Sequence, residues 1–274
     1  MRIGVAHETL YSYDPPASGV IQILRLTPRN HAGQYVLNWR VDVSHDYRLD
    51  QHEDAFGNIT HSFSAAGPLD SLSVRVEGAV ETQETAGIVQ GAVERFPPSL
   101  YLRESRLAAA DPAITQFARE CRAETGEARL TLLHGLSQRL HQTLVFDTDP
   151  THAATSAAEA FRLGRGVCQD FSHIFIAACR QLGVPARYVG GYLRRSDGAA
   201  QSAGHAWAEA HVPDLGWVAF DPTNGISATE GYVRVAVGLD YLDAAPVRGS
   251  RFGGGSETLA VRVTVDQAQW QAQD

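Results

Sequence analysis

Apolar and polar positions alternate along the first third of the chain. Residues 37–44 change from apolar to polar at every step, and residues 72–76 repeat this pattern. A period of two is typical of a strand with one buried face. Turn sequences such as Asp14-Pro15-Pro16 and Gly67-Pro68 separate these segments. We therefore predict a β-rich domain over residues 1–95, built as an antiparallel, sandwich-like sheet.

The hydrophobic period changes after Phe96-Pro97-Pro98-Ser99, where consecutive prolines disfavour both helix and central strand. Asp111 followed by Pro112 is a typical helix start, and helical spacing follows it. Strands return after Pro185. The spacing predicts helices at 112–121, 133–140, 155–163 and 168–182, and strands at 187–193, 206–212, 217–220, 231–237 and 259–265.

Helices followed by a run of strands indicate an α+β fold with an antiparallel sheet. We assign residues 96–274 to this core domain, with the proline-rich segment as the boundary. Within the core, we expect Gly249 to Ser256 to form a glycine-rich surface loop.

Composition narrows the class of protein. The 274 residues are 44% apolar, which is too much for a disordered chain. A net charge of −8 argues against nucleic-acid binding, and neither a basic cluster nor a long apolar run indicates a membrane partner. The N-terminal segment becomes polar too early for a secretory signal, so we expect a cytoplasmic protein. Three cysteines do not make a disulfide framework.

The helix at 168–182 begins with a cysteine. Cys168 shares one helical face with Phe171 and Phe175, and it lies in the first turn. Free N–H groups and a partial positive charge at a helix start favour thiolate over thiol. The thiolate is a nucleophile, and the same N–H groups can bind an oxyanion.

A nucleophilic thiol needs a base and a group that orients the base. His205 opens one predicted strand, and Asp221 ends the next, just before Pro222. A turn near Asp214 would join the two strands as a hairpin. Antiparallel registry then makes His205 and Asp221 neighbours.

Three segments carry a resemblance to a known family: Gly166-Val167-Cys168-Gln169-Asp170-Phe171, Gly204-His205-Ala206-Trp207-Ala208-Glu209 and Trp217-Val218-Ala219-Phe220-Asp221-Pro222-Thr223. Together they resemble the transglutaminase-like cysteine-enzyme superfamily, in the order Cys, His, Asp on helix, strand, strand. Tyr11-Ser12-Tyr13, Leu24-Arg25-Leu26-Thr27-Pro28 and Asp54-Ala55-Phe56-Gly57-Asn58 resemble the β domain that precedes this core in a bacterial branch.

The resemblance implies a papain-like core, in which a helix carrying Cys168 packs on a sheet carrying His205 and Asp221. Cys168 would attack an amide and form a thioester, His205 would transfer the proton, and Asp221 would orient the imidazole. Water as the acceptor makes the protein a protease or amidase for peptide or isopeptide bonds, without a cofactor. The alternatives are a protein-glutamine acyltransferase, which uses an amine, and a catalytically silent binding module.

Other residues compete for these roles. Cys121 and Cys179 are expected to be buried small hydrophobes. His173 and His211 are rival bases, which we expect to be structural or solvated. No C-x-x-C or H-x-x-x-H pair is present, so we predict no metal site.

Neighbouring residues are expected to support the site. Asp170 should act as a partner of the helix dipole in the first turn. Gln169 and Trp207 should shape the site. Residues 142–147 are a candidate source of the second oxyanion donor.

Overall fold

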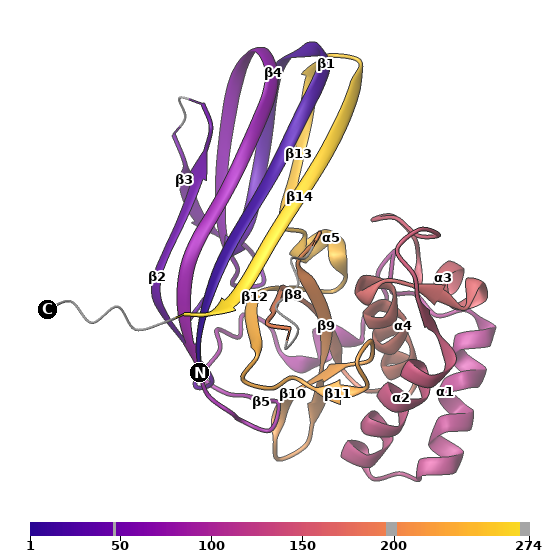
Figure 1. Ribbon diagram of the computed structural model, residues 1–274. Helices are drawn as coiled ribbons and strands as arrows, with labels where there is room; N and C mark the ends of the chain where they lie inside the picture. The colour runs from indigo at the N-terminus through magenta and orange to yellow at the C-terminus, as the bar shows by residue number, and fades with distance from the viewer. Residues whose placement is uncertain (46–47, 196–201, 269–274) are drawn as a thin grey trace, which may run out of the picture.

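The computed structural model describes residues 1–45, 48–195 and 202–268, and it contains two antiparallel sheets and a layer of helices (Figure 1). One sheet has the order β13-β1-β4-β2, with β14 also beside β1 and β3 beside β4. Its strands are β1 (Arg2–Thr27), β2 (Gln34–Val43), β3 (Asp50–Glu53), β4 (Ile59–Thr82), β13 (Val247–Gly253) and β14 (Ser256–Gln267).

The second sheet has the order β11-β10-β9-β8-β12, with β5 beside β10. Its strands are β5 (Ile88–Val89), β8 (Ala186–Leu193), β9 (His205–Val212), β10 (Gly216–Asp221), β11 (Ile226–Ser227) and β12 (Tyr232–Gly238). A short parallel pair joins β6 (Val145–Phe146) and β7 (Arg165–Gly166). The helices are η1 (Pro98–Leu102, 3₁₀), α1 (Pro112–Thr125), α2 (Arg129–Thr143), α3 (Ala157–Leu163), α4 (Cys168–Gln181) and α5 (Tyr241–Ala244).

The N-terminal sheet folds over on itself. Its two long strands, β1 and β4, bend where the sequence has Asp14-Pro15 and Gly67-Pro68, both of which are cis peptide bonds. The pairing of β1 with β4 jumps there, because β1 carries extra residues around the corner. Side chains from both halves of the strands, among them Leu24 and Leu72, share one hydrophobic core. The predicted antiparallel, sandwich-like domain is therefore confirmed as one bent sheet.

The last two strands require a correction. We expected residues 247–267 to belong to the core, but β13 and β14 both pair with β1 of the N-terminal sheet (Figure 1). The expected loop at Gly249 to Ser256 is also wrong, because Gly249 to Gly253 lie in β13. Hydrogen bonds to the open edge of β1 outweigh the weak strand preference of glycine. Strand β5 departs from the expected domains in the opposite way. It lies before residue 95, in the range assigned to the N-terminal domain, but it pairs with β10 of the core sheet.

Helix α4 lies at the centre of the core. Every residue from Asp170 to Arg180 is buried, because α1, α2 and α3 pack on one side and β9 lies on the other (Figure 1). A helix that is enclosed in this way can be apolar on all faces, so its buried surface extends beyond the single face read from the sequence. The predicted N-cap of α1 is also present, since the Asp111 carboxylate accepts the Ile114 N–H at 2.9 Å.

Side chains with paired hydrogen bonds join the two sheets. Asn58 both accepts from the Val237 N–H and donates to the Val237 carbonyl, each at 2.8 Å. Gln34 makes the same two-way contact with the backbone of Arg234, at 2.9 and 2.8 Å. Such double contacts fix both distance and orientation, so the sheets have a defined relative position. Over the described ranges, none of the helices has the length and apolar character needed to cross a membrane.

Candidate active site

Cys168 is the first residue of α4 and is half-buried. The chain reaches it through a tight connection from α3, which ends at Gly164 in the left-handed region (φ 68°). Strand β7 follows at once and pairs with β6, which holds the segment just before the helix. This sequence of an αL glycine, a two-residue strand and a helix start places the thiol at the N-terminus of α4.

Asp170 caps this helix start from the first turn. Its Oδ2 accepts the Val167 N–H at 2.8 Å and the Thr151 hydroxyl at 2.7 Å. Burial raises the pKa of the Asp170 carboxyl above its usual value. A Cβ on Gly166 would collide with this carboxylate, so the glycine allows the cap to close. Asp170 therefore holds the turn that carries Cys168, consistent with its expected role in the first turn.

His205 and Asp221 are in direct contact. The His205 Nε2–H donates to Asp221 Oδ2 at 2.6 Å. Strand register pairs Ala208 with Phe220, so continuing the ladder sets Asp221 opposite Trp207. His205 is thus the diagonal neighbour of Asp221 on the same face of the hairpin, rather than its direct opposite.

Five donors surround the Asp221 carboxylate. Oδ2 also accepts the Asn224 side-chain amide at 2.6 Å and the Tyr232 hydroxyl at 2.7 Å. Oδ1 accepts the backbone N–H groups of Thr223 and Asn224, at 2.9 and 3.2 Å. Burial of this fully enclosed group favours the neutral form, but the bond to His205 and its charge outweigh burial and lower the pKa of Asp221. Asp221 is therefore held as an anion with a fixed orientation.

The imidazole of His205 lies between two acidic partners. Burial opposes its charge, but hydrogen bonds to Asp221 and to the Cys168 side chain raise the pKa of His205 to about 10. Because Nε2 bonds Asp221, Nδ1 is the ring nitrogen left for the sulfur. The ring also stacks on Trp207, with centroids 6.2 Å apart. The arrangement favours an imidazolium beside the sulfur at neutral pH.

The rival residues have other partners. His173 is fully buried, and its Nε2 accepts the Tyr241 N–H at 3.1 Å. His211 lies against the Trp217 ring at 5.4 Å. Cys121 and Cys179 are both buried, and burial raises the pKa of each thiol. These thiols are therefore held in the protonated, poorly nucleophilic form.

Two N–H groups of residues 142–147, the segment expected to supply a second oxyanion donor, already have backbone partners. The N–H of Val145 donates to the Gly164 carbonyl at 3.0 Å, and that of Asp147 donates to Gly166 at 2.9 Å. Both N–H groups are thus engaged in holding β7. Gln169 instead borders the cavity at Cys168 and donates to the Ala153 carbonyl at 3.3 Å.

A cavity of about 290 Å³ opens beside Cys168 and His205. Residues of both sheets line it: Tyr188 and Gly191 come from the core, while His7 and Thr9 come from β1. The thiol and imidazole therefore have direct access to a space that could hold part of a ligand.

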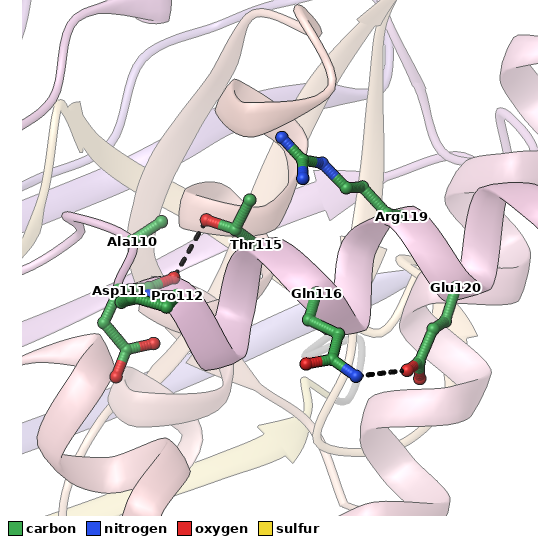
Figure 2. Close-up of a pocket in the computed structure, with 7 residues that line it drawn as sticks. All are labelled: Ala110, Asp111, Pro112, Thr115, Gln116, Arg119 and Glu120. Carbon is green, nitrogen blue, oxygen red and sulfur yellow. Dashed lines mark hydrogen bonds between the residues drawn. The ribbon is translucent and has the colours of Figure 1, made fainter.

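A larger hollow of about 830 Å³ lies elsewhere, along the start of α1 (Figure 2). Figure 2 shows that its seven lining residues come from this helix and the two residues before it, with Gln116 donating to Glu120 at 2.8 Å. It shares no lining residue with the cavity at Cys168, and neither cysteine nor histidine lines it. The hollow consequently offers neither a thiol nor an imidazole.

Sequence reasoning missed two partners of Asp221. Asn224 follows it by three residues in a turn, a spacing at which an Asx side chain commonly bonds nearby groups, so a signal for it existed. Tyr232 comes from β12, and nothing local marks it. Within the described part of the chain, no three His, Cys, Asp or Glu side chains group as metal ligands.

Comparison with known proteins supports the family resemblance. Residues 115–222 match the family model of the transglutaminase-like superfamily, and residues 3–81 match that of the bacterial transglutaminase-like N-terminal region. An uncharacterised protein of Mycobacterium leprae is 31% identical, over 96% of this chain and 98% of its own length.

Two further proteins are similar to all or part of the chain. A candidate cysteine protease from Cytophaga hutchinsonii, known from a crystal structure, has a TM-score of 0.75 at 22% identity. The alignment covers 99% of this chain and 92% of that one, which shows a common fold. A Pseudomonas aeruginosa protein named protein-glutamine gamma-glutamyltransferase is 27% identical, over 45% of this chain and 20% of its own length. Because the two family models together match most of its length, the chain belongs to the transglutaminase-like superfamily.

Proposed function

We propose that the protein is a cofactor-independent cysteine hydrolase of peptide or isopeptide amide bonds. One observation carries the proposal: the imidazole of His205 contacts both Asp221 and the Cys168 side chain at the edge of a cavity. That arrangement contains a nucleophile, a proton carrier and an orienting anion in the order that acyl transfer requires.

In the reactive pair the Cys168 proton is already on Nδ1 of His205, the imidazolium form that the raised pKa of His205 favours, and the sulfur is a thiolate. The sulfur then attacks the amide carbonyl carbon, and the carbonyl oxygen becomes an oxyanion. The N–H groups of the first turn of α4 lie beside this position and can bind the oxyanion. The hydrogen bonds within the helix begin only with the N–H groups of Asp170 and Phe171, which donate to the Val167 carbonyl. Asp221 stabilises the imidazolium throughout this step.

Collapse of the adduct breaks the C–N bond. His205 gives its proton to the departing amine, and the acyl group remains on Cys168 as a thioester. Water attacks the thioester with His205 now accepting a proton from it, which releases a carboxylic acid and restores the thiolate–imidazolium pair. Each proton removed is returned, so no external cofactor is needed.

Transamidation is the second candidate, because a relative carries the name protein-glutamine gamma-glutamyltransferase. An amine would then replace water as the acceptor. All 23 basic residues of this chain are arginines, so it contains no lysine side chain that could be modified by its own thioester. An added glutamine peptide therefore cannot be coupled to a lysine of the enzyme itself, and the labelled primary amine is the acceptor to be measured. Incorporation into an added glutamine peptide faster than hydrolysis would favour the transferase.

The decisive experiment compares wild-type protein with Cys168→Ala on a library of peptide amides, with products identified by mass spectrometry. Cys179→Ala is the matched control, because that thiol is fully buried on the same helix. We expect hydrolysis to fall at least 10³-fold in Cys168→Ala and to persist in the control. Equal activity in both variants would reject the proposal.

A silent binding module predicts a different result. Its Cys168 would react with iodoacetamide no faster than a free cysteine at neutral pH, and no acyl-enzyme would form in cell extract. We also propose a peptide or protein substrate, which the peptide library tests. We further propose a cytoplasmic location, which cell fractionation tests.

A further inference from the structure

Strand β1 presents one continuous inner face with three different neighbours. Near its start, Ile3 and Val5 pack into the core domain. Farther along, Tyr11 and Tyr13 pack inside the folded-over sheet. Between them, His7 and Thr9 belong to neither hydrophobic core; both are buried and line the cavity beside Cys168. The N-terminal sheet thus supports the two cores at its ends and leaves a gap between them.

Strand β14 extends this wall. Its register pairs Thr9 with Val261 and Tyr11 with Leu259, and both β14 residues line the same cavity. Across the space are Cys168 and His205, so any group in the cavity lies between the nucleophile and the N-terminal sheet.

Apart from the Cys168–His205 pair, the lining has little charge. Among the described residues that line the cavity, none is Asp, Glu, Lys or Arg. His7 bonds Tyr192 through Nδ1 and Thr9 through Nε2, at 2.9 and 3.0 Å, so both ring nitrogens are occupied. Burial lowers the pKa of His7 to about 4, which leaves the ring neutral at pH 7. A charged side chain placed against the β1–β14 wall, away from the Cys168–His205 pair, would lose water without gaining an ionic partner.

We infer that the middle of β1 and β14 forms a substrate subsite that takes one uncharged, mainly apolar side chain next to the amide attacked by Cys168. This inference rests on the proposed function and adds a substrate class to it. The cavity volume of about 290 Å³ is the volume that roughly ten water molecules occupy in liquid water. This space suits one large side chain and is too small for a folded segment. The N-terminal domain is then a specificity element of the active site.

A pair of adjacent substitutions tests this. Val261→Trp fills the cavity from β14, whereas Ala260→Trp adds the same bulk on the other face, where Ala260 is exposed and pairs with the exposed Leu10. Both are made in a Cys168→Ala background, so that binding is measured without turnover. Labelled peptide amides that differ in one residue (phenylalanine, leucine, alanine, glutamate or arginine) are the probes, with fluorescence anisotropy as the readout.

We expect the phenylalanine and leucine peptides to bind at least tenfold more tightly than the glutamate and arginine peptides. Burying a large apolar side chain corresponds to a roughly ten- to hundredfold gain in affinity. Val261→Trp should remove that gain and leave the alanine peptide within about twofold, while Ala260→Trp changes neither. If Val261→Trp lowers the melting temperature sharply, Leu259→Trp replaces it, because Leu259 lines the cavity and is 57% exposed.

Preference for a charged peptide, or equal effects of the tryptophan at 260 and at 261, would overturn the subsite. The proposed function is judged separately by hydrolysis with wild-type protein. Selective binding without hydrolysis would reject the proposed hydrolase function and support the subsite. Hydrolysis without selective binding would support the hydrolase function and reject the subsite.

Discussion

Replacing Asp221 with asparagine should disable the protein through the tautomer of His205. The two backbone N–H groups of Thr223 and Asn224 bond Oδ1, so the asparagine carbonyl must take that position. Its NH₂ group then stands where Oδ2 was, 2.6 Å from His205 Nε2. Because two donors cannot share a hydrogen bond, Nε2 must become the acceptor, and the ring proton moves to Nδ1, facing the sulfur.

The magnitude follows from this geometry. An imidazole with its proton already on Nδ1 cannot accept the Cys168 proton. The equivalent change in a Ser-His-Asp triad lowers kcat by about 10⁴. We expect a loss of about 10³ to 10⁴ in kcat for Asp221→Asn, which raises the barrier by about 4–5 kcal/mol. Stability should fall by about 1–3 kcal/mol, because the buried donors around Asp221 lose a charged acceptor.

The assay measures amide hydrolysis, the iodoacetamide labelling rate of Cys168 and unfolding in urea on the same samples. Asp240→Asn is the matched control: Asp240 is also a buried carboxylate that accepts backbone N–H groups, from Leu242 and Leu107, but it does not bond His205. We expect Asp240→Asn to lose stability and keep its labelling rate. If Asp221→Asn labels and hydrolyses within about twofold of wild type, the tautomer argument is refuted.

Two further predictions concern stability. Glu209 is fully buried and bonds Arg187 at 2.6 Å and Arg234 at 2.7 Å, so Glu209→Gln should lower the free energy of unfolding in urea by about 3–5 kcal/mol; a loss under about 1 kcal/mol would contradict this. Burial lowers the pKa of His7 from 6.5 to about 4, so between these values the unfolded chain binds a proton that the folded protein excludes. This contribution to stability is complete above about pH 6.5 and should fall by up to about 3 kcal/mol as pH drops to 4. His7→Gln should flatten that part of the stability–pH curve, and an unchanged slope would contradict the assignment.

Local signals in the sequence predicted much of the core. The Asp111 cap, the helical spacing that follows it and the hairpin around Asp214 depend on residues within a few positions of one another. Long-range strand pairing carries no such signal, since an alternating strand fits any sheet with a free edge. Residues 259–265 were therefore identified as a strand and placed in the wrong sheet.

The candidate site shows the same difference between local and long-range signals. The helix start at Cys168 and the hairpin that joins His205 to Asp221 could be read from local geometry. Tyr232 and the β1 wall of the cavity could not, because their contact with the site depends on how whole sheets pack. Bonds such as those of Asn58 to Val237 fix that packing, and they connect residues whose partnership no periodicity reveals.

The late pairing of β1 has a consequence for newly made chains. Among the described strands, β13 and β14 alone cover one edge of this strand, and about 220 residues separate Thr27 from Val247. At roughly 5–20 residues per second, a ribosome needs about 10–45 s to cross that interval. Throughout this time a long alternating strand keeps an unsatisfied row of N–H and C=O groups, which is a template for pairing with other chains. In the folded protein β13 and β14 pair with this edge, so the edge is exposed only before folding is complete. Aggregation during synthesis therefore depends more on translation speed and on chaperone binding than on the stability of the native state.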